Sequence, residues 1–426
     1  MADVLPFKAL HYDLDAVGGL EKVAAPPYDV IDETMREELL GRSPYNAVAI
    51  DLPKPYGHSG PVEAGGDPYA EAAAKIEAWR ADGALVDDEE PAIWALTQDY
   101  TAPDGTSHSR HGILVRVRVE DYDGSVRPHE RTLPGPLKDR LDLTRATRHN
   151  LSPIFSLSTE DAWPLVEPAI ADTEPWGEVT DADGTVNRVW RVGDPEIHAA
   201  VIELLRDAEL LIADGHHRYE TARAYRDEIG GEGDHNYTLM ALTGLADPGL
   251  TVFATHRLLS GFAGDPERQQ RLGNGLRDLF DVEEIATEEL DPRGEAGVGV
   301  FGFIDSHHKQ AYRLRLKDVA ALDTRLEGKP EAYRRLDSAI LELLVLKDLA
   351  GLSEEDILAK RGIGYAKNVP DTLALVEDGS YDVAFFLRPI PVDQVRAICE
   401  TDENMPPKST FFFPKVMTGF VFNPVG

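Results

Sequence analysis

The sequence predicts a mixed α/β fold, and three observations support this prediction. Two segments rich in apolar residues, Ala92–Tyr100 and Arg110–Val119, flank a Pro-Asp-Gly turn, as the strands of a β-hairpin do. Pro195–Ala208 has apolar residues at helical spacing and a proline in its first turn. It leads directly into the short apolar run Leu210–Ala213, which predicts a buried strand. Strands and helices therefore alternate along the chain, as they do in α/β proteins.

The composition is that of a globular protein with an acidic surface. At 426 residues the chain is long enough for two or three domains, and 42% of its residues are hydrophobic. The formal net charge of −33 argues against partners such as nucleic acids or anionic lipids, which bind Lys- and Arg-rich surfaces. No apolar run in the sequence approaches the roughly 18 to 20 residues of a membrane helix, and the N-terminus has no secretory pattern. With a single cysteine, Cys399, these features predict a cytoplasmic protein.

Further elements follow from hydrophobic periodicity and from turn and capping residues. A rigid Pro-Pro turn precedes Tyr28 and Asp29, and Asp32 then caps a helix. The predicted helices are Glu33–Leu40, Pro68–Asp82, Pro266–Phe280, Glu331–Leu349 and Val392–Glu400. The predicted strands are Gly184–Val192, Tyr237–Leu245, Leu250–Thr255, Gly297–Ile304, Ala311–Leu316 and Tyr381–Leu387.

A strand, a glycine turn and a helix meet at the segment Asp214, Gly215, His216, His217 and Arg218. Free N–H groups and the positive end of the helix dipole converge at such a helix start. Gly215 lets a ligand approach the backbone, Arg218 offers a planar set of donors, and the two histidines add further donors. Ordinary turn chemistry with solvent-facing histidines is the alternative. Because four complementary polar groups directly follow a buried strand, we interpret this segment as a phosphate-binding loop.

The carboxylate of Asp214 would repel a bound phosphate unless something relieves the repulsion. A Mg²⁺ ion shared between carboxylate and phosphate oxygens would do so, as would a role in holding the ammonium or hydroxyl group of an acceptor. Either role makes Asp214 catalytic. Phosphoryl transfer from ATP or ADP needs cations on the transferring oxygens and a carboxylate that takes the acceptor proton. Arg218, His216 and Lys138 or Arg140 are the candidates for the cations, and Glu130 or Asp214 for the base.

One region of the acidic sequence is locally basic. It lies within Val126–Thr159 and contains His129, Glu130, Arg131, Lys138, Asp139, Arg140, Arg145, Arg148, His149 and Asn150. A helix with solvated charges would explain such a run, but His-Glu-Arg before a Pro/Gly turn is an awkward start for a plain amphipathic helix. We therefore assign His129, Arg131, Lys138 and Arg140 to phosphate or nucleotide binding.

These motifs also carry a resemblance to known families. The turn Asp214–Tyr219 looks like the nucleotide-phosphate loop of the ParB/sulfiredoxin-like superfamily, and Leu151–Phe155 looks like the strand upstream of it. More specifically, the whole chain resembles the bacterial and archaeal domain-of-unknown-function family 1015. The matching segments are VAAPPYDVI at Val23–Ile31, HERT at His129–Thr132, KDR at Lys138–Arg140, IADGHHR at Ile212–Arg218 and MPPKSTFFFPK at Met405–Lys415.

The resemblance implies a ParB/sulfiredoxin-like nucleotide-binding core, expected over residues 121–260, between α/β portions at 1–120 and 261–426. Its nearest enzymatic relatives are free-serine kinases, which implies a glutamate as the base, and Glu130 is the candidate. Pro406–Thr410 lacks the glycines of a P-loop, so it is not a Walker site. Lys408 lies in the family motif and is kept as a nucleotide contact.

Three functions remain open on this sequence. The first is a kinase that uses ATP or ADP with Mg²⁺ to phosphorylate a small hydroxy amino acid, plausibly free L-serine. The second is a nucleotide-binding switch of the ParB type, and the third is a metal-dependent phosphohydrolase using Asp214, His216 and His217. Consecutive histidines do not easily face one metal, which disfavours the third. The expected partners are a nucleotide and a small-molecule substrate, and the sequence does not give the oligomeric state.

Overall fold

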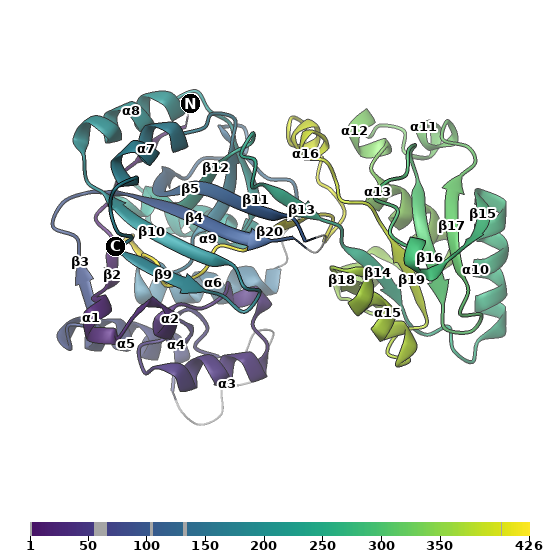
Figure 1. The fold of residues 1–426 in the computed structure, drawn as a ribbon, viewed down its shortest axis with the longest axis horizontal. Coiled ribbons are helices and arrows are strands. Elements are labelled where there is room, and N and C mark those ends of the chain that lie inside the picture. Colours follow the sequence, from purple (N-terminus) through teal and green to yellow (C-terminus); the bar gives the residue numbers. More distant parts are fainter. Residues whose placement is uncertain (1, 55–65, 103–104, 131–133, 402) are drawn as a thin grey trace. The chain divides into compact units, whose positions relative to one another are not determined.

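The computed structural model describes residues 2–54, 66–102, 105–130, 134–401 and 403–426, without the side chains of 134–136. The chain forms two compact units. Unit 1 comprises Met1–Pro128, Thr132–Leu250 and Pro414–Gly426, and unit 2 comprises His129–Arg131 and Thr251–Phe413. Each unit is therefore built from segments that are far apart in the sequence (Figure 1).

Unit 1 contains a nine-stranded mixed sheet within the described residues, in the order β6-β11-β8-β12-β5-β4-β10-β9 with β1 paired to β5. Its strands are β1 (Val4–Leu5), β4 (Ile93–Thr101), β5 (Ser107–Arg118), β6 (Val126–Arg127), β8 (Ile154–Ser158), β9 (Gly177–Thr180), β10 (Val186–Val192), β11 (Leu210–Asp214) and β12 (Tyr237–Gly244). The predicted hairpin is confirmed as antiparallel β4 and β5. Strands from both sides of residue 120 share this sheet, so the division expected there does not separate them.

Helices and short strands surround this sheet. The helical segments of unit 1 are α1 (Leu14–Val17), α2 (Leu20–Val23), η1 (Tyr28–Val30), α3 (Glu33–Arg42), α4 (Val48–Asp51), α5 (Pro68–Ala81), α6 (Pro134–Thr147), α7 (Trp163–Ile170), α8 (Pro195–Leu205), α9 (His216–Ile229) and η2 (Asp234–Asn236). Short strand pairs join β2 (Leu10–Tyr12) to β3 (Leu85–Asp87), and β7 (His149–Asn150) to β21 (Asn423–Pro424). Asp32 caps α3 as predicted, by accepting a hydrogen bond from the Met35 N–H group.

The core of unit 1 places the start of α9 beside the end of a buried strand. Leu210 and Ile212 of β11 are completely buried, as is Tyr219 of α9. The antiparallel pairing of β11 with β8 shifts register between Ile212 and Asp214. Burial of these apolar side chains stabilises β11 in the sheet and α9 against it. Only Gly215 separates the end of β11 from the start of α9.

Unit 2 contains a six-stranded antiparallel sheet within the described residues, in the order β15-β17-β16-β19-β14-β18. Its strands are β14 (His256–Leu259), β15 (Phe280–Ile285), β16 (Val300–Asp305), β17 (Ala311–Leu316), β18 (Ile363–Ala366) and β19 (Val383–Phe386), and β13 (Thr251–Phe253) pairs separately with β20 (Phe411–Phe413). Its helical segments are α10 (Pro266–Leu279), η3 (Thr287–Glu289), α11 (Ala321–Arg325), α12 (Glu331–Arg334), α13 (Asp337–Leu341), η4 (Glu342–Leu349), α14 (Glu354–Leu358), α15 (Val369–Glu377) and α16 (Val392–Cys399).

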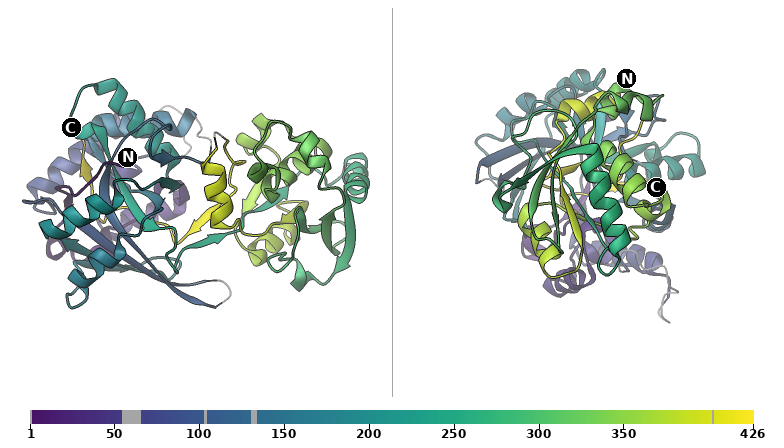
Figure 2. Two further views of the ribbon diagram at one scale, coloured as in Figure 1. Left: turned by 90° about the horizontal axis from the view of Figure 1, so that it is seen from above. Right: turned by 90° about the vertical axis from the view of Figure 1, so that its right-hand side faces the viewer.

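Helices cover both faces of the unit 2 sheet. One face, with Phe301, Leu314 and Phe385, packs against α10, α13 and η4. The opposite face, with Ala384 and Phe386, packs against α15. Figure 2 shows α10 running along the sheet. In the part of the chain that the structure describes, no helix is long and apolar enough to cross a membrane.

The single long helix predicted for Glu331–Leu349 was wrong, because the chain breaks near Leu336. Leu336 is extended, with φ −80° and ψ 118°, and it separates α12 from α13. The Asp337 carboxylate accepts hydrogen bonds from the Gly299 N–H group at 2.9 Å and from Arg388 at 2.6 and 2.8 Å. Helical periodicity cannot reveal this break. Leu336 is buried at the break itself, where a continuous helix would also have an apolar residue.

Candidate functional site

Gly215 forms the turn between β11 and α9 as predicted. Its φ of 101° and ψ of 29° lie in the left-handed region, where a side chain is strained. A Cβ atom added at this position would lie 2.8 Å from Nε of Arg218. Glycine is therefore needed both for the turn and for the guanidinium group that lies against it.

The Asp214 carboxylate lies between two cations at this turn. Arg218 Nη2 donates to one oxygen of Asp214 at 2.9 Å, and Lys415 Nζ donates to the other at 2.7 Å. The three side chains are 9% (Arg218), 16% (Asp214) and 17% (Lys415) exposed. Because water is largely excluded, these ion pairs are screened less than surface pairs are.

The donors of Arg218, which the sequence suggests for a phosphate, are bonded within the protein in this structure. Its Nη1 donates to the carbonyl oxygen of Pro153 and its Nη2 to Asp214, so phosphate binding by Arg218 stays a prediction. The guanidinium group thus joins the start of α9 to the segment before β8. Arg218 and Lys415 place two positive charges against the Asp214 carboxylate, which reduces the repulsion expected between that carboxylate and a phosphate.

Arg110 is a third cation near the turn. It is almost completely buried, its guanidinium group donates to the Gln98 side chain, and it lies 4.2 Å from the Phe155 ring centre. Burial lowers its pKa to about 9, and the charges of Tyr100, Asp247 and Asp214 oppose this, so Arg110 remains protonated at pH 7. Gln98 also donates to the Lys415 carbonyl at 3.0 Å. We call Arg110, Arg218 and Lys415 the cation cluster. Asp214 pairs with Arg218 and Lys415, and the charges of Asp214 and Asp247 both act on Arg110.

The two histidines of the turn differ in exposure. His216 is 7% exposed, and His217 is half-buried. The Thr221 hydroxyl donates to the His217 carbonyl oxygen at 2.8 Å within α9. Among the described residues, no group of three or more His, Cys, Asp or Glu side chains is arranged to hold a metal ion. The geometry therefore gives no support to the metal-dependent phosphohydrolase.

The family motifs of unit 1 meet around a buried polar network. Arg140 Nη1 donates to the Asp51 carboxylate at 3.2 Å and to its carbonyl oxygen at 2.6 Å, while Nε and Nη2 bond Asp139. The guanidinium group lies 4.2 Å from the Tyr28 ring centre. Ser152 donates to the Asp51 carboxylate at 2.7 Å. Burial lowers the pKa of Arg140, but Asp51 and Asp139 outweigh it and raise the pKa above its ordinary value.

A cavity of about 40 Å³ next to this network is lined by Tyr28, Asp51, Arg140, Ser152 and Arg218, among others. It is large enough for a water molecule and too small for a nucleotide. The Arg140 guanidinium group donates its hydrogen bonds to protein oxygens. Phosphate binding by Arg140 therefore stays a prediction, which this geometry does not support.

Lys138 lies on the exposed side of α6. Its side chain is 80% exposed and pairs with Asp142 at 2.6 Å, one helical turn away. Arg145 pairs with Asp142 and Glu228. The basic run on α6 is thus largely neutralised by neighbouring carboxylates, as in an ordinary solvated helix face, and Lys138 as a nucleotide contact stays a prediction.

His129, Glu130 and Lys408 belong to unit 2. The Met405 N–H group donates to the His129 carbonyl at 2.8 Å, and Glu130 forms a parallel bridge with Met405. His129 is buried, and its Nε2 lies 3.0 Å from the Thr410 hydroxyl. The Lys408 N–H group lies 3.5 Å from the Glu130 carboxylate. The HERT and MPPK motifs thus lie side by side, and Arg131 lies outside the described residues.

Three site residues were not found from the sequence. Lys415 is the last residue of the family motif that begins at Met405, so the motif contained it, but nucleotide binding is predicted from the sequence for Lys408 of the same motif. Arg110 and Asp51 carry no local motif, and only the fold shows that they are buried beside other motif residues.

Comparisons with known structures find weak similarity. A conserved hypothetical protein from Pyrococcus furiosus is 15% identical, with a TM-score of 0.36 over 72% of this chain and 95% of its own. A variant of free serine kinase in complex with ADP is 11% identical, with a TM-score of 0.38 over 72% and 92%. SbnI with a C-terminal truncation, from Staphylococcus aureus, is 12% identical, with a TM-score of 0.37 over 72% and 86%. Such low values give no information on the activity of this chain.

No curated protein matches the sequence. The model of one protein family, described as "Protein of unknown function (DUF1015)", matches residues 4–339. This match covers more than half of the chain and includes four of the five motifs described above. The chain therefore belongs to the DUF1015 family.

Proposed function

We propose that this protein is a nucleotide-dependent small-molecule kinase that transfers a phosphoryl group from ATP or ADP to a hydroxy amino acid such as free L-serine. The observation that carries the proposal is the cation cluster at the start of α9, in a protein whose formal net charge is −33. Phosphoryl transfer depends mainly on positioning and on cations at the transferring oxygens. The resemblance of the motifs to those of free-serine kinases suggests the acceptor.

In this proposal, the phosphates of the nucleotide bind at the N-terminus of α9, where Gly215 permits close approach. Lys415 and Arg218 replace some of their hydrogen bonds to Asp214 with hydrogen bonds to phosphate oxygens. His216 and His217 supply further donors. Asp214 would hold a Mg²⁺ ion that accompanies the nucleotide, because carboxylate oxygens are among its preferred ligands, and the ion would supply further positive charge for the phosphates. Glu130 remains the proposed base for the acceptor hydroxyl group.

Replacing Lys415 tests the phosphate site. We expect Lys415→Met to weaken ATP or ADP binding about ten- to a hundredfold, because it removes one charge-assisted hydrogen bond. The stability of unit 1 should change little, since Arg218 still pairs with Asp214. Isothermal titration with ATP, ADP and CTP, each with and without Mg²⁺, measures the effect.

The matched control is Lys8→Met, since Lys8 is an exposed lysine of unit 1 that forms no hydrogen bond or ion pair with the described residues of the turn. Equal affinities in the two variants would contradict the assignment of phosphates to the turn.

A second function, a nucleotide-binding switch, is favoured by the ion pairs themselves. A phosphate competes with Asp214 for Lys415 and Arg218, so binding would release the tie between α9 and the segment before β8. A coupled assay for nucleotide turnover, with and without L-serine, separates the two functions. Turnover that depends on L-serine identifies the kinase, whereas binding without turnover identifies the switch.

Replacing Glu130 tests the base. We expect Glu130→Gln to lower the rate of L-serine-dependent turnover by at least about a hundredfold, the size of a general-base contribution, while nucleotide affinity is unchanged. The amide keeps the size of the side chain and can still accept the bond from the Lys408 N–H group. Full activity in this variant would show that another group takes the proton.

A further inference from the structure

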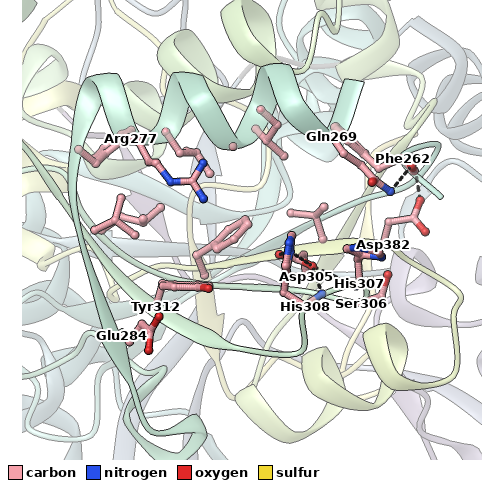
Figure 3. Close-up of a pocket in the computed structure, with 18 of the residues that line it drawn as sticks. Phe262, Gln269, Arg277, Glu284, Asp305, Ser306, His307, His308, Tyr312 and Asp382 are labelled. Carbon is pink, nitrogen blue, oxygen red and sulfur yellow. Dashed lines mark hydrogen bonds and ion pairs between the residues drawn. The ribbon is translucent and has the colours of Figure 1, made fainter. Parts of the chain in front are cut away.

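Unit 2 contains a cavity of about 460 Å³ between α10 and the strands β15, β16 and β17 (Figure 3). Its apolar lining includes Leu272, Leu276, Phe280, Phe303, Leu314 and Val383. Small-molecule sites typically have volumes of about 300 to 1,000 Å³, an apolar lining and a few converging polar groups. This cavity, which we call the α10 pocket, has all three features.

The pocket exists because α10 covers only part of the sheet. Alternate residues of β15 face the same side. Phe280 is 1% exposed beneath the helix, whereas Val282, two residues further on, is 38% exposed. Val282 is one of two large apolar side chains among the described residues that are exposed to this extent. The edge of the sheet beyond Phe280 is therefore an apolar floor open to a ligand.

A cation reaches into the pocket from above this floor. Figure 3 shows Arg277 extending from α10 toward the strands. The Arg277 carbonyl oxygen accepts a hydrogen bond from Lys317 Nζ at 2.6 Å, which places a second positive charge at the same end of α10. Within the described ranges, no carboxylate forms an ion pair with the Arg277 guanidinium group. Its donors are available to an anionic group of a ligand.

A carboxylate lies across the pocket from Arg277. Glu284 of β15 lies beside Tyr312 of β17, as Figure 3 shows and the strand register requires. Burial raises the pKa of Tyr312 above its usual value; the charges of Glu284 and Asp305 raise it further, and Arg277 opposes them. The charges of Glu284, Asp305 and Arg277 thus all influence the ionisation of Tyr312.

The acidic side chains that line the pocket differ in their hydrogen-bond and ion-pair partners. Asp305 is bonded to the ring and N–H group of His308, and Asp382 accepts from the Phe262 N–H group. Glu284 has no ion-pair partner among the residues that the structure describes. Arg277 and Glu284 are thus two opposite charges that line one cavity and do not neutralise each other.

We propose that the α10 pocket binds a free α-amino acid with an apolar side chain, of the leucine or phenylalanine class. Arg277 binds the carboxylate, Glu284 binds the ammonium group, and the side chain lies over Phe303 and Leu314. A simple organic anion would leave Glu284 without a partner and repel it, and a simple amine would do the same to Arg277. The site is separate from the nucleotide turn, which belongs to unit 1.

Isothermal titration of the full chain with three related molecules tests this proposal. L-phenylalanine carries both charges, phenethylamine only the ammonium group, and 3-phenylpropanoate only the carboxylate. We expect L-phenylalanine to bind at least about tenfold more tightly than either, because each charged hydrogen bond contributes roughly a factor of ten or more. L-serine, which lacks an apolar side chain, should bind more weakly than L-phenylalanine at this site.

Two variants locate the charges. Arg277→Leu should weaken L-phenylalanine binding about tenfold or more without weakening phenethylamine, from which it removes a repelling charge. Glu284→Gln should likewise weaken L-phenylalanine without weakening 3-phenylpropanoate. Both side chains are exposed, so both variants should fold. The control is Arg271→Leu on α10, because Arg271 bonds the Leu349 carbonyl and does not line the pocket.

Lys415→Met in unit 1 should leave L-phenylalanine binding unchanged, which distinguishes this site from the nucleotide turn. No preference for L-phenylalanine over the amine and the acid, or binding that neither pocket variant weakens, would overturn the proposal.

Discussion

Arg140→Met should destabilise unit 1 by about 3 to 5 kcal/mol. The side chain of Arg140 is 5% exposed, and that of Asp51, with which it pairs, is 6% exposed. Removing one partner of a buried ion pair leaves the other charge without compensation, and breaking such pairs typically has this cost. Ser152 and Thr418 still bond the Asp51 carboxylate after the substitution, but both are neutral donors.

Tryptophan fluorescence during urea unfolding measures this effect, because all five tryptophans lie in unit 1. The matched control is Arg145→Met on the same helix, α6. Arg145 is 43% exposed and pairs with Asp142 and Glu228 at the surface, so its loss should cost less than about 1 kcal/mol.

A second variant separates loss of packing from loss of charge. In the double variant Arg140→Met with Asp51→Asn, the uncompensated charge is absent, so the double variant should be more stable than Arg140→Met alone. If Arg140→Met were as stable as Arg145→Met, the network would not be important for the stability of the fold.

Much of this fold follows from local patterns. The β4–β5 hairpin, the strand β11 and the helix α9 were predicted because alternation, helical spacing and a Gly turn are local signals. The chain break at Leu336 has no such signal, because it depends on Asp337 bonding Gly299 and Arg388, which are distant in the sequence. At Leu336 the conformation of the chain is therefore set by contacts with distant residues and not by the local helical periodicity.

The candidate site shows the same limit. The turn Asp214–Arg218 was recognisable as polar groups after a buried strand, but its most informative contact joins Asp214 to Lys415, 201 residues later. The chain reaches that contact only after leaving unit 1 at Thr251 and returning at Pro414. The sequence therefore identified residue types suited to phosphate, whereas the pairing of Arg218 with Asp214 needed coordinates.

Acid should destabilise unit 2 through a buried histidine, His256. This residue is 3% exposed, its Nδ1 accepts the Leu387 N–H group at 3.2 Å, and its ring lies 5.1 Å from that of Phe386. Burial, with smaller contributions from Arg257 and Arg293, lowers its pKa to about 4. Protonation of His256 at Nδ1 would also remove the acceptor of the hydrogen bond from the Leu387 N–H group.

The direction of the pH dependence follows from the two states. The folded-state pKa of about 4 lies below the value of about 6.5 expected for an unfolded chain. Between these values the unfolded state binds more protons, so the stability that neutral His256 gives is complete above pH 6.5 and falls as pH falls toward 4. The loss should reach about 2 kcal/mol at pH 5 and about 3 kcal/mol below pH 4.

Hydrogen exchange of the amides of β14 and β19, compared at pH 7 and pH 5 after correction for intrinsic rates, measures this loss in unit 2. Tryptophan fluorescence does not report on this unit, since its described segments contain no tryptophan. His256→Gln keeps an acceptor for the Leu387 N–H group but does not titrate, so the change between pH 7 and pH 5 should be smaller by about 2 kcal/mol. His308→Gln, at an exposed histidine, should leave the change as it is in the natural protein. An equal pH dependence in the natural protein and in His256→Gln would mean that the acid sensitivity of unit 2 comes from its carboxylates, which bond more weakly when protonated.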